Sequence, residues 1–362
     1  MSRKHNFNAG PSVLPLPVLE AAAKDLVDTK GLGLSVLEMS HRSKDFEAIL
    51  ARAKETLARL LSLPEDYDVL FLQGGASQQF AMVPMNLGTG GAYVTTGAWS
   101  QKALAEAKIV GEASEIWTDA AANFKRVPRP DEELGVPAGA PFLHYTTNNT
   151  IFGTEWRHVP KASVPQASVP LVADMSSDIL SRPIDVGRFG IIYAGAQKNA
   201  GPSGVTLVIG KRSILRGFSG PSWVPAILRY QTHAKADSLY NTPNTFGIWL
   251  CGQVFEWIER EGGLAAMEKR AEAKAGRLYD VIDRRPDVFT GHAEKGSRSR
   301  MNVTFTMASP EAEKRFLDEA KAKGCIGLAG HRSVGGLRAS IYNALPMESV
   351  EVLASLMEKF EA

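Results

Sequence analysis

Residues 191–204 have the sequence IIYAGAQKNAGPSG, in which an apolar run leads to Lys198 and a loop rich in glycine and proline follows. The run is typical of a buried strand, and an amine at its end is partly removed from water, which disfavours the ammonium form. A neutral amine is the nucleophile that forms a Schiff base with a carbonyl compound. Two interpretations of Lys198 follow: a lysine held as an imine, or a solvated loop lysine.

A second apolar run, VPLVA at residues 169–173, ends in Asp174, 24 positions before Lys198. Ligands of open α/β sheets bind at the carboxyl ends of the strands, and a carboxylate there can face a bound ring. In enzymes that use pyridoxal phosphate (PLP), such an acid keeps the ring nitrogen protonated and strengthens the cofactor as an electron sink. The alternative is that Asp174 caps a turn. Spacing alone does not separate these interpretations, because strand-Asp and strand-Lys pairs are common.

The composition is that of an ordinary soluble globular protein. The 362 residues suggest two domains, and the net charge of +2 gives no field strong enough to indicate a nucleic-acid partner. The two cysteines, Cys251 and Cys325, fall in an expected helix and at an expected helix end, so neither a disulfide framework nor a metal site is predicted. No apolar run approaches the length of a membrane span, and a cytoplasmic location is expected.

Short β-rich runs alternate with helical ones through the first two thirds of the chain. Helical periodicity spans residues 18–28 and 46–61. The expected strands are 69–72, 92–95, 142–145, 169–173, 190–194 and 205–209. This alternation predicts an α/β fold with a mainly parallel sheet and helices on both faces. Residues 159–170 are expected to form a loop.

The last third of the chain has a different order of elements. Two long helices are expected at 246–260 and 264–283. They are followed by a strand, a helix, a strand and a helix at 301–307, 310–323, 337–342 and 347–360. The prediction is a large domain at 16–260, a smaller α+β C-terminal domain at 261–362, and an N-terminal segment, 1–15, that packs with the small domain.

A candidate phosphate site follows the first expected strand. The run VLFLQ at 69–73 leads into GGAS at 74–77, and a helical pattern begins at Gln78. A strand, a small-residue turn and a helix start expose backbone N–H groups at the positive end of the helix dipole, which suits a phosphate. The alternative is a plain turn, because the motif matches neither a P-loop nor a dinucleotide fingerprint.

Two further side chains follow strand ends. Trp99 could stack on a flat ring, although packing alone explains most of the six tryptophans. Thr150, in the sequence NNTIFG at 148–153, could donate a hydrogen bond to a ring hydroxyl or simply order its loop. Because all these positions lie at strand ends, one site could gather them.

Basic side chains indicate an anionic substrate. His41-Arg42 and His331-Arg332 are two dipeptides in expected loops, and Arg338 follows the second. Arginine pairs with carboxylate or phosphate through two parallel hydrogen bonds. A single α-carboxylate needs one arginine, so the surplus points to a phosphorylated or dicarboxylic amino acid.

Seven motifs occur along the chain in a fixed order. They are FNAGP at 7–11, SHRSKDF at 40–46, GGAS at 74–77, ADMSS at 173–177, YAGAQKN at 193–199, NTPNTF at 241–246 and GHRSVGGLRASIYNA at 330–344. Together they closely resemble the phosphoserine aminotransferase family of class V, fold-type I PLP-dependent enzymes. The resemblance covers essentially the whole chain. One departure is Ser77, where some relatives carry a basic residue, and it bears on the strength of distal-anion binding.

The resemblance implies a cofactor site. Lys198 would carry PLP as an imine, Asp174 would meet the ring nitrogen, and catalysis would depend on both. Trp99 would stack on the ring, and Thr150 would reach the ring hydroxyl. The phosphate of PLP would be held by Ala76, Ser77 and Gln197, and by Asn241 and Thr242 from the other subunit of a homodimer with shared active sites.

The resemblance also implies the substrates. Arg338 would bind the α-carboxylate, and the substrate phosphate or glutamate side chain would be clamped by His331 and Arg332 with the partner subunit's His41 and Arg42. The reaction would transfer the amino group of L-glutamate to 3-phosphohydroxypyruvate and give O-phospho-L-serine and 2-oxoglutarate, with Lys198 moving the proton.

Other functions remain open at this point. The same chemistry on 3-hydroxy-2-oxo-4-phosphooxybutanoate, a vitamin B6 precursor, is not distinguished by the sequence. PLP-dependent sulfur removal would need a reactive cysteine on a mobile loop, and neither cysteine is expected in one. A PLP-binding module without turnover would not need the guanidinium of Arg338 to bind a substrate carboxylate.

Overall fold

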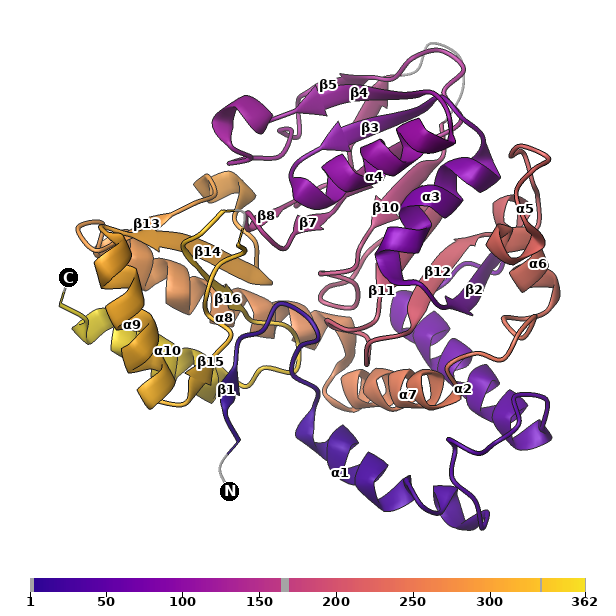
Figure 1. Cartoon of the computed structure of the whole chain (residues 1–362), viewed down its shortest axis with the longest axis horizontal. Helices are drawn as coiled ribbons and strands as arrows, with labels where there is room; N and C mark the ends of the chain where they lie inside the picture. Colours follow the sequence, from indigo (N-terminus) through magenta and orange to yellow (C-terminus); the bar gives the residue numbers. More distant parts are fainter. Residues whose placement is uncertain (1–2, 164–168, 333, 362) are drawn as a thin grey trace.

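The computed structural model describes residues 3–163, 169–332 and 334–361. A seven-stranded sheet forms the centre of the large domain (Figure 1). In spatial order its strands are β2 (Tyr67–Leu72), β12 (Thr206–Lys211), β11 (Ile191–Gly195), β10 (Leu171–Asp174), β6 (Leu143–Thr146), β3 (Gly91–Thr95) and β4 (Ala113–Thr118). β12 is antiparallel to both neighbours, and the other pairs are parallel. The carboxyl ends of the six other strands therefore lie along one edge of the sheet.

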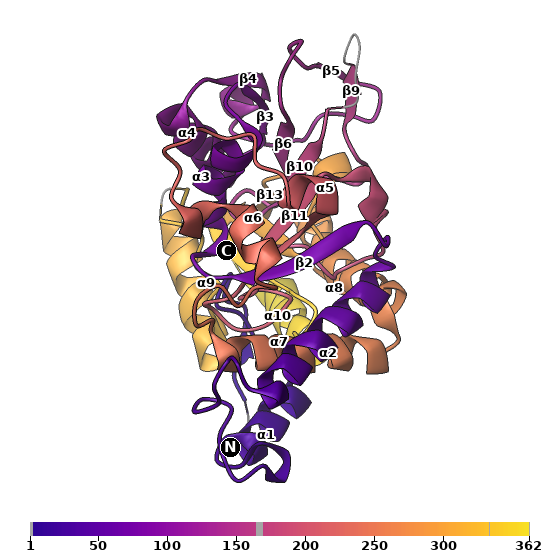
Figure 2. The ribbon, with the colours of Figure 1, turned by 90° about the vertical axis from the view of Figure 1, so that its right-hand side faces the viewer.

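Helices cover both faces of this sheet. One face carries α2 (Lys44–Leu61) and α7 (Thr245–Arg260), which lie side by side in Figure 2. The other face carries α3 (Gly75–Leu87), α4 (Ala98–Val110) and α6 (Tyr230–Lys235). Along β10 the side chain of Ala173 packs in the first layer and that of Val172 in the second, as the alternation of a strand requires. Every residue of β10 and β11 is buried, because both faces of these strands are covered.

The start of α2 illustrates how local sequence fixes an element. The Ser43 side chain accepts a hydrogen bond from the backbone N–H of Phe46, which satisfies one of the free donors of the first turn. Asp45 and Glu47 add negative charge at the positive end of the helix dipole. Phe46 and Leu50, four positions apart, then bury the face that packs on the sheet.

The small domain has its own core. It contains α8 (Gly263–Arg284), β13 (Phe289–Gly291), β14 (Asn302–Met307), α9 (Pro310–Ala322), β15 (Cys325–Ile326), β16 (Leu337–Ser340) and α10 (Met347–Lys359). β14 lies between β13 and β16 in an antiparallel sheet. Edge-to-face contacts of Phe289 with Phe305 and Phe316 fill the space between this sheet and the helices.

The N-terminal segment connects the two domains. β1 (His5–Asn6) pairs in parallel with β15, and Phe7 is fully buried in the small-domain core (Figure 1). The chain then crosses to the large domain, where the Ser12 N–H donates to the Gln197 carbonyl (2.9 Å), before α1 (Leu16–Asp25) begins. The segment therefore contacts both domains, and the assignment of residues 1–15 to the small domain stays a prediction. The exact domain limits stay a prediction.

Shorter elements complete the chain. The strand pairs are β5 (Glu133–Gly135) with β9 (Lys161–Ser163) and β7 (Asn148–Asn149) with β8 (Thr154–Glu155). The remaining helices are α5 (Arg212–Leu215) and the 3-10 turns Thr29–Gly31, Ala120–Ala122, Val186–Arg188, Ala226–Leu228 and Lys295–Ser297. Across the described residues, no helix is both long enough and apolar enough to cross a membrane.

The α/β fold with a mainly parallel sheet and a smaller α+β domain is confirmed. Two local expectations were wrong. Cys325 lies in β15 rather than at a helix end, because α9 stops at Ala322 and Gly324 turns the chain with a φ of +83°. The expected loop at 159–170 contains β9, and its residues 164–168 lie outside the described part.

Candidate active site

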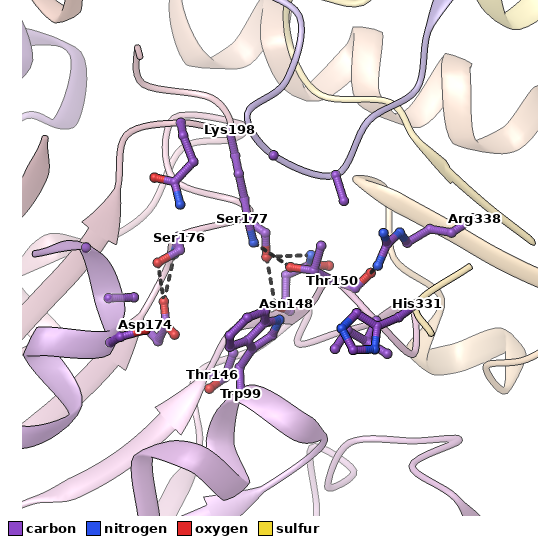
Figure 3. Close-up of a pocket in the computed structure, with 17 residues that line it drawn as sticks. Trp99, Thr146, Asn148, Thr150, Asp174, Ser176, Ser177, Lys198, His331 and Arg338 are labelled. Carbon is purple, nitrogen blue, oxygen red and sulfur yellow. Dashed lines mark hydrogen bonds between the residues drawn. The ribbon is translucent and has the colours of Figure 1, made fainter. Parts of the chain in front are cut away.

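A cavity of about 310 Å³ opens at the carboxyl edge of the large sheet. Its walls come from three parts of the chain: Ala9 and Gly10 of the N-terminal segment, strand ends of the large domain, and His331 and Arg338 of the small domain (Figure 3). The cavity therefore lies where the domains meet, in the position in which open α/β sheets bind ligands.

Lys198 lies in the middle of this cavity. The buried strand β11 and Ala196 lead to it, and its Nζ donates a hydrogen bond to Thr150 Oγ1 at 2.6 Å (Figure 3). Burial lowers the pKa of the amine from 10.5 to about 8, and the nearby charge of Asp174 opposes that shift. A substantial fraction of the amine is therefore neutral near pH 8, which Schiff-base chemistry requires.

Asp174 is the last residue of β10, and only 4% of it is exposed. Its Oδ1 accepts hydrogen bonds from the backbone N–H (2.9 Å) and the hydroxyl (2.6 Å) of Ser176. Burial raises the pKa of Asp174, whereas the Ser176 hydrogen bonds and the charge of Lys198 lower it. A buried carboxylate oriented in this way is suited to a cationic ring nitrogen.

The turn at residues 74–77, for which a phosphate site is predicted, leads from β2 into the first turn of α3. Gly74, with a φ of +85°, turns the chain from β2 into α3, and within the described residues no side chain caps the helix start. The N–H groups at the start of an α-helix have no partner inside the helix. Ala76 and Ser77 line the cavity at this point, so a phosphate can approach their backbone.

Basic residues occupy the opposite part of the cavity. The Arg338 Nη1 donates to the Thr150 carbonyl (3.3 Å), and its buried Nε is without a hydrogen-bond partner among the described residues. Burial lowers the pKa of Arg338. Burial also lowers the pKa of His331, with further contributions from the charges of Arg338, Arg332 and Lys102. Arg338 stays protonated at neutral pH, so this end of the cavity carries a positive charge and is suited to bind carboxylate or phosphate.

Nine of the fourteen residues expected in the site line this one cavity. They are Ala76, Ser77, Trp99, Thr150, Asp174, Gln197, Lys198, His331 and Arg338. The five others do not line it within this chain: His41, Arg42, Asn241, Thr242 and Arg332. The first four of these are the residues for which a position in a second subunit was expected. The fifth, Arg332, was expected to act within its own chain, and it is exposed.

Other cavity residues were not anticipated. Ser176 orients Asp174, and its signal is a serine two positions after a strand-end aspartate, the spacing of a side-chain turn. Asn148 donates to Ser177 Oγ (2.9 Å) and to Asn302 Oδ1 (2.8 Å) and so ties the cavity floor to β14. Its partners are too distant in sequence for a local signal.

The cysteines are not placed for catalysis. Cys251 is fully buried in α7, and burial raises the pKa of its thiol. Burial raises the pKa of Cys325 to about 11. Thiolate chemistry requires a lowered pKa and access to solvent, so sulfur removal finds no nucleophile in these two residues.

The residues of the cavity fit PLP. Ala76 and Ser77 offer backbone donors to its phosphate, Asp174 offers a carboxylate to its ring nitrogen, and Lys198 offers an amine to its aldehyde. Trp99 lines the same cavity, and its ring centre lies 5.9 Å from the Lys198 Nζ. This fold and this site define a PLP-dependent aminotransferase.

Comparison with known proteins leads to the same class of enzyme. A family model for class-V aminotransferases matches residues 4–353. The phosphoserine aminotransferase of Geobacillus kaustophilus is 55% identical over 99% of this chain and 99% of its own, and that of Bacillus subtilis is 54% identical over 100% and 99%. The chain belongs to the class-V aminotransferase family, in the group of the phosphoserine aminotransferases.

Solved structures extend this similarity to three dimensions. Phosphoserine aminotransferase from Bacillus circulans subsp. alkalophilus has a TM-score of 0.94 at 48% identity, covering 99% of this chain and 98% of its own. The PLP-bound enzyme from Trichomonas vaginalis has a TM-score of 0.92 at 37% identity, covering 99% and 100%.

Proposed function

We propose that this chain transfers the amino group of L-glutamate to 3-phosphohydroxypyruvate, giving O-phospho-L-serine and 2-oxoglutarate. The observation that carries the proposal is the positive charge of Arg338, which lines the same cavity as Lys198, with the imidazole of His331 nearby. Both substrates have an α-carboxylate and a second anionic group. Relatives that are 50% or more identical are named phosphoserine aminotransferases, which supports the same substrates here.

The proposed roles follow from the chemistry of each group. When bound, PLP supplies an electron sink for the negative charge that develops at the substrate Cα. Asp174 would hold positive charge on the ring nitrogen by electrostatic attraction, because its carboxylate is buried and fixed by Ser176. Arg338 binds the α-carboxylate and orients the Cα–H bond toward Lys198. The neutral Lys198 Nζ would take that proton from Cα and pass it to the cofactor carbon.

We also propose that the active site is shared across a homodimer. Asn241 and Thr242 are exposed and His41 and Arg42 do not line the cavity of their own chain, which supports their assignment to the partner's site. Mixing Lys198→Ala with His41→Ala/Arg42→Ala subunits tests this assignment. A shared site predicts that the mixture regains activity that neither variant has alone, and mixtures without gain would contradict it. The expected cytoplasmic location stays a prediction.

A coupled assay tests the substrate assignment. The purified holoenzyme is given L-glutamate with either 3-phosphohydroxypyruvate or 3-hydroxy-2-oxo-4-phosphooxybutanoate, and kcat/KM is compared. A higher kcat/KM for 3-phosphohydroxypyruvate supports the proposal, and the reverse order assigns the chain to the second keto acid. An active Lys198→Ala protein would refute the mechanism itself, and borohydride reduction should fix the cofactor to Lys198 of the wild type.

Replacement of Arg338 tests its proposed role in binding the substrate α-carboxylate. Loss of a charge-assisted pair should raise KM for both L-glutamate and the keto acid by roughly 10- to 100-fold. Arg284→Ala is a matched control, because Arg284 pairs with surface carboxylates of α8 and α10 and its side chain is 58% exposed. An Arg338→Ala enzyme with unchanged KM for both substrates would remove Arg338 from the proposed role.

A further inference from the structure

Tyr342 is a buried tyrosine at the junction of the two domains. It follows β16, and none of its surface is exposed. Its hydroxyl donates to the Ala9 carbonyl at 2.8 Å and accepts from the Asn302 Nδ2 at 3.1 Å. One phenol thus contacts the N-terminal segment and β14, which are far apart in sequence.

The Tyr342 hydroxyl also lies within interaction distance of the Thr150 side chain. Burial raises the pKa of Tyr342 to about 12, and hydrogen bonds with Asn302, Ser340 and Thr150, together with the charge of Arg338, act against that rise. The Thr150 Oγ1 accepts the hydrogen bond from the Lys198 Nζ. Thr150 has a single hydroxyl hydrogen, so while it accepts from Lys198 it can donate to Tyr342.

The surroundings hold Tyr342 in place. The buried Lys274 of α8 donates to the backbone carbonyls of Tyr342 (2.6 Å) and Leu345 (3.1 Å), which fixes the turn that carries the phenol. The Asn302 side chain is held on its other side, because its Oδ1 accepts from Asn148 at 2.8 Å. A buried polar network in which each member has its partners is rigid.

We propose that Tyr342 is a positioning residue for Lys198, which acts by fixing the Thr150 hydroxyl that accepts the hydrogen bond from the lysine amine. The proposal rests on the function assigned above to Lys198. It gives the small domain a part in the proton transfer, although Tyr342 does not itself line the cavity. Removal of the phenol oxygen would leave the Thr150 hydroxyl free to rotate away from the amine.

Two consequences can be measured in Tyr342→Phe. In the cofactor-free protein the Lys198 ammonium loses a fixed acceptor, so its titration midpoint should fall below the wild-type value of about 8. The other charges near the amine, Asp174, Asp178 and Arg338, are unchanged. In the holoenzyme kcat should fall roughly three- to tenfold with little change in KM, as expected when one hydrogen bond that orients a catalytic group is lost.

Competitive acetylation measures the first consequence without turnover. Cofactor-free protein is labelled across a pH series, and the peptide that contains Lys198 is quantified by mass spectrometry. Tyr67→Phe is the matched control: Tyr67 is also buried and its hydroxyl also bonds to a backbone carbonyl, that of Phe189, but it lies at the amino end of β2, away from the cavity. A midpoint and kcat in Tyr342→Phe equal to those of Tyr67→Phe would overturn the proposal.

A double-mutant cycle tests the route through Thr150. If Tyr342 acts through that hydroxyl, Thr150→Val and Thr150→Val/Tyr342→Phe should have the same Lys198 midpoint, whereas additive shifts would overturn the proposed route. Borohydride fixation of PLP to Lys198 in the wild type separates the outcomes. Absence of that linkage refutes the proposed function, and an unshifted midpoint with the linkage present refutes only the role of Tyr342.

Discussion

Replacement of Asp174 by Asn and of Arg338 by Gln should move the titration of the Lys198 amine in opposite directions. The charge of Asp174 stabilises the ammonium form of Lys198, and the charge of Arg338 destabilises it. Asp174→Asn should therefore lower the midpoint below about 8, and Arg338→Gln should raise it above that value. Burial, the largest cause of the lowered pKa, is unchanged in both variants.

The magnitude follows from the fraction of neutral amine. With a pKa of about 8, about 9% of Lys198 is neutral at pH 7, compared with about 0.03% for an amine at the ordinary value of 10.5. The site thus increases the concentration of nucleophile about 300-fold at that pH. At pH values below the midpoint, a variant whose amine has a tenfold larger acid dissociation constant should capture PLP about ten times faster.

The assay is the rate at which cofactor-free protein binds PLP covalently, followed by absorbance across a pH series. In wild type the rate constant should rise with pH and level off above about 8, because only the neutral amine reacts. Asp174→Asn should capture PLP faster than wild type at low pH and yet transaminate more slowly, because the ring nitrogen has lost its counter-ion. A wild-type midpoint near the ordinary value of 10.5, or midpoints of both variants that move in one direction, would refute the assigned electrostatics.

Three further outcomes are expected. Burial lowers the pKa of Lys274 to about 7, whereas the unfolded chain keeps the ordinary value of 10.5. Between these values the unfolded state binds a proton that the folded state does not, so the Tm should rise as the pH increases from about 7 toward 10. Lys274→Met should reduce this dependence of Tm on pH. Glu155→Gln should lower the free energy of unfolding by about 3 kcal/mol in urea titrations, because Arg300 loses a buried carboxylate. Glu272 is an exposed partner of the same arginine, so Glu272→Gln should lower the free energy of unfolding by less than about 1 kcal/mol. The Cys251 thiol should stay unmodified in native protein and react with a thiol reagent only after unfolding, as mass spectrometry would reveal.

The central strands could be predicted because their burial leaves a direct trace in sequence. β10 and β11 are covered on both faces, so every position is apolar or small up to the functional residue at the end. β4 left no such trace, because it is an edge strand with Ser114 and Glu115 exposed. β15 was missed because two residues form a strand only through pairing with β1, more than three hundred positions away.

The residues of the candidate site likewise fall into two groups: those that the sequence predicts and those that it does not. Asp174 and Lys198 could be inferred because one ends its strand and the other closely follows its strand, and the parallel sheet brings the strand ends together. Tyr342 lies in a motif that the sequence made visible, but its contacts with Ala9 and Asn302 depend on the packing of one domain against the other. A single sequence carries no local signal for such contacts.

The path of the N-terminal segment has a consequence for biosynthesis. Residues 5–12 leave the ribosome before their partners, β15 and Tyr342, which lie more than three hundred positions further along the chain. The Ser12 hydroxyl, which donates to the Lys198 carbonyl at 2.6 Å, connects the same segment to the reactive lysine. The large domain can condense during translation, but the wall of the cavity closes only after Tyr342 has emerged. Stable capture of the cofactor is therefore expected to follow synthesis of the small domain, and shorter nascent chains would be protected from premature chemistry at Lys198.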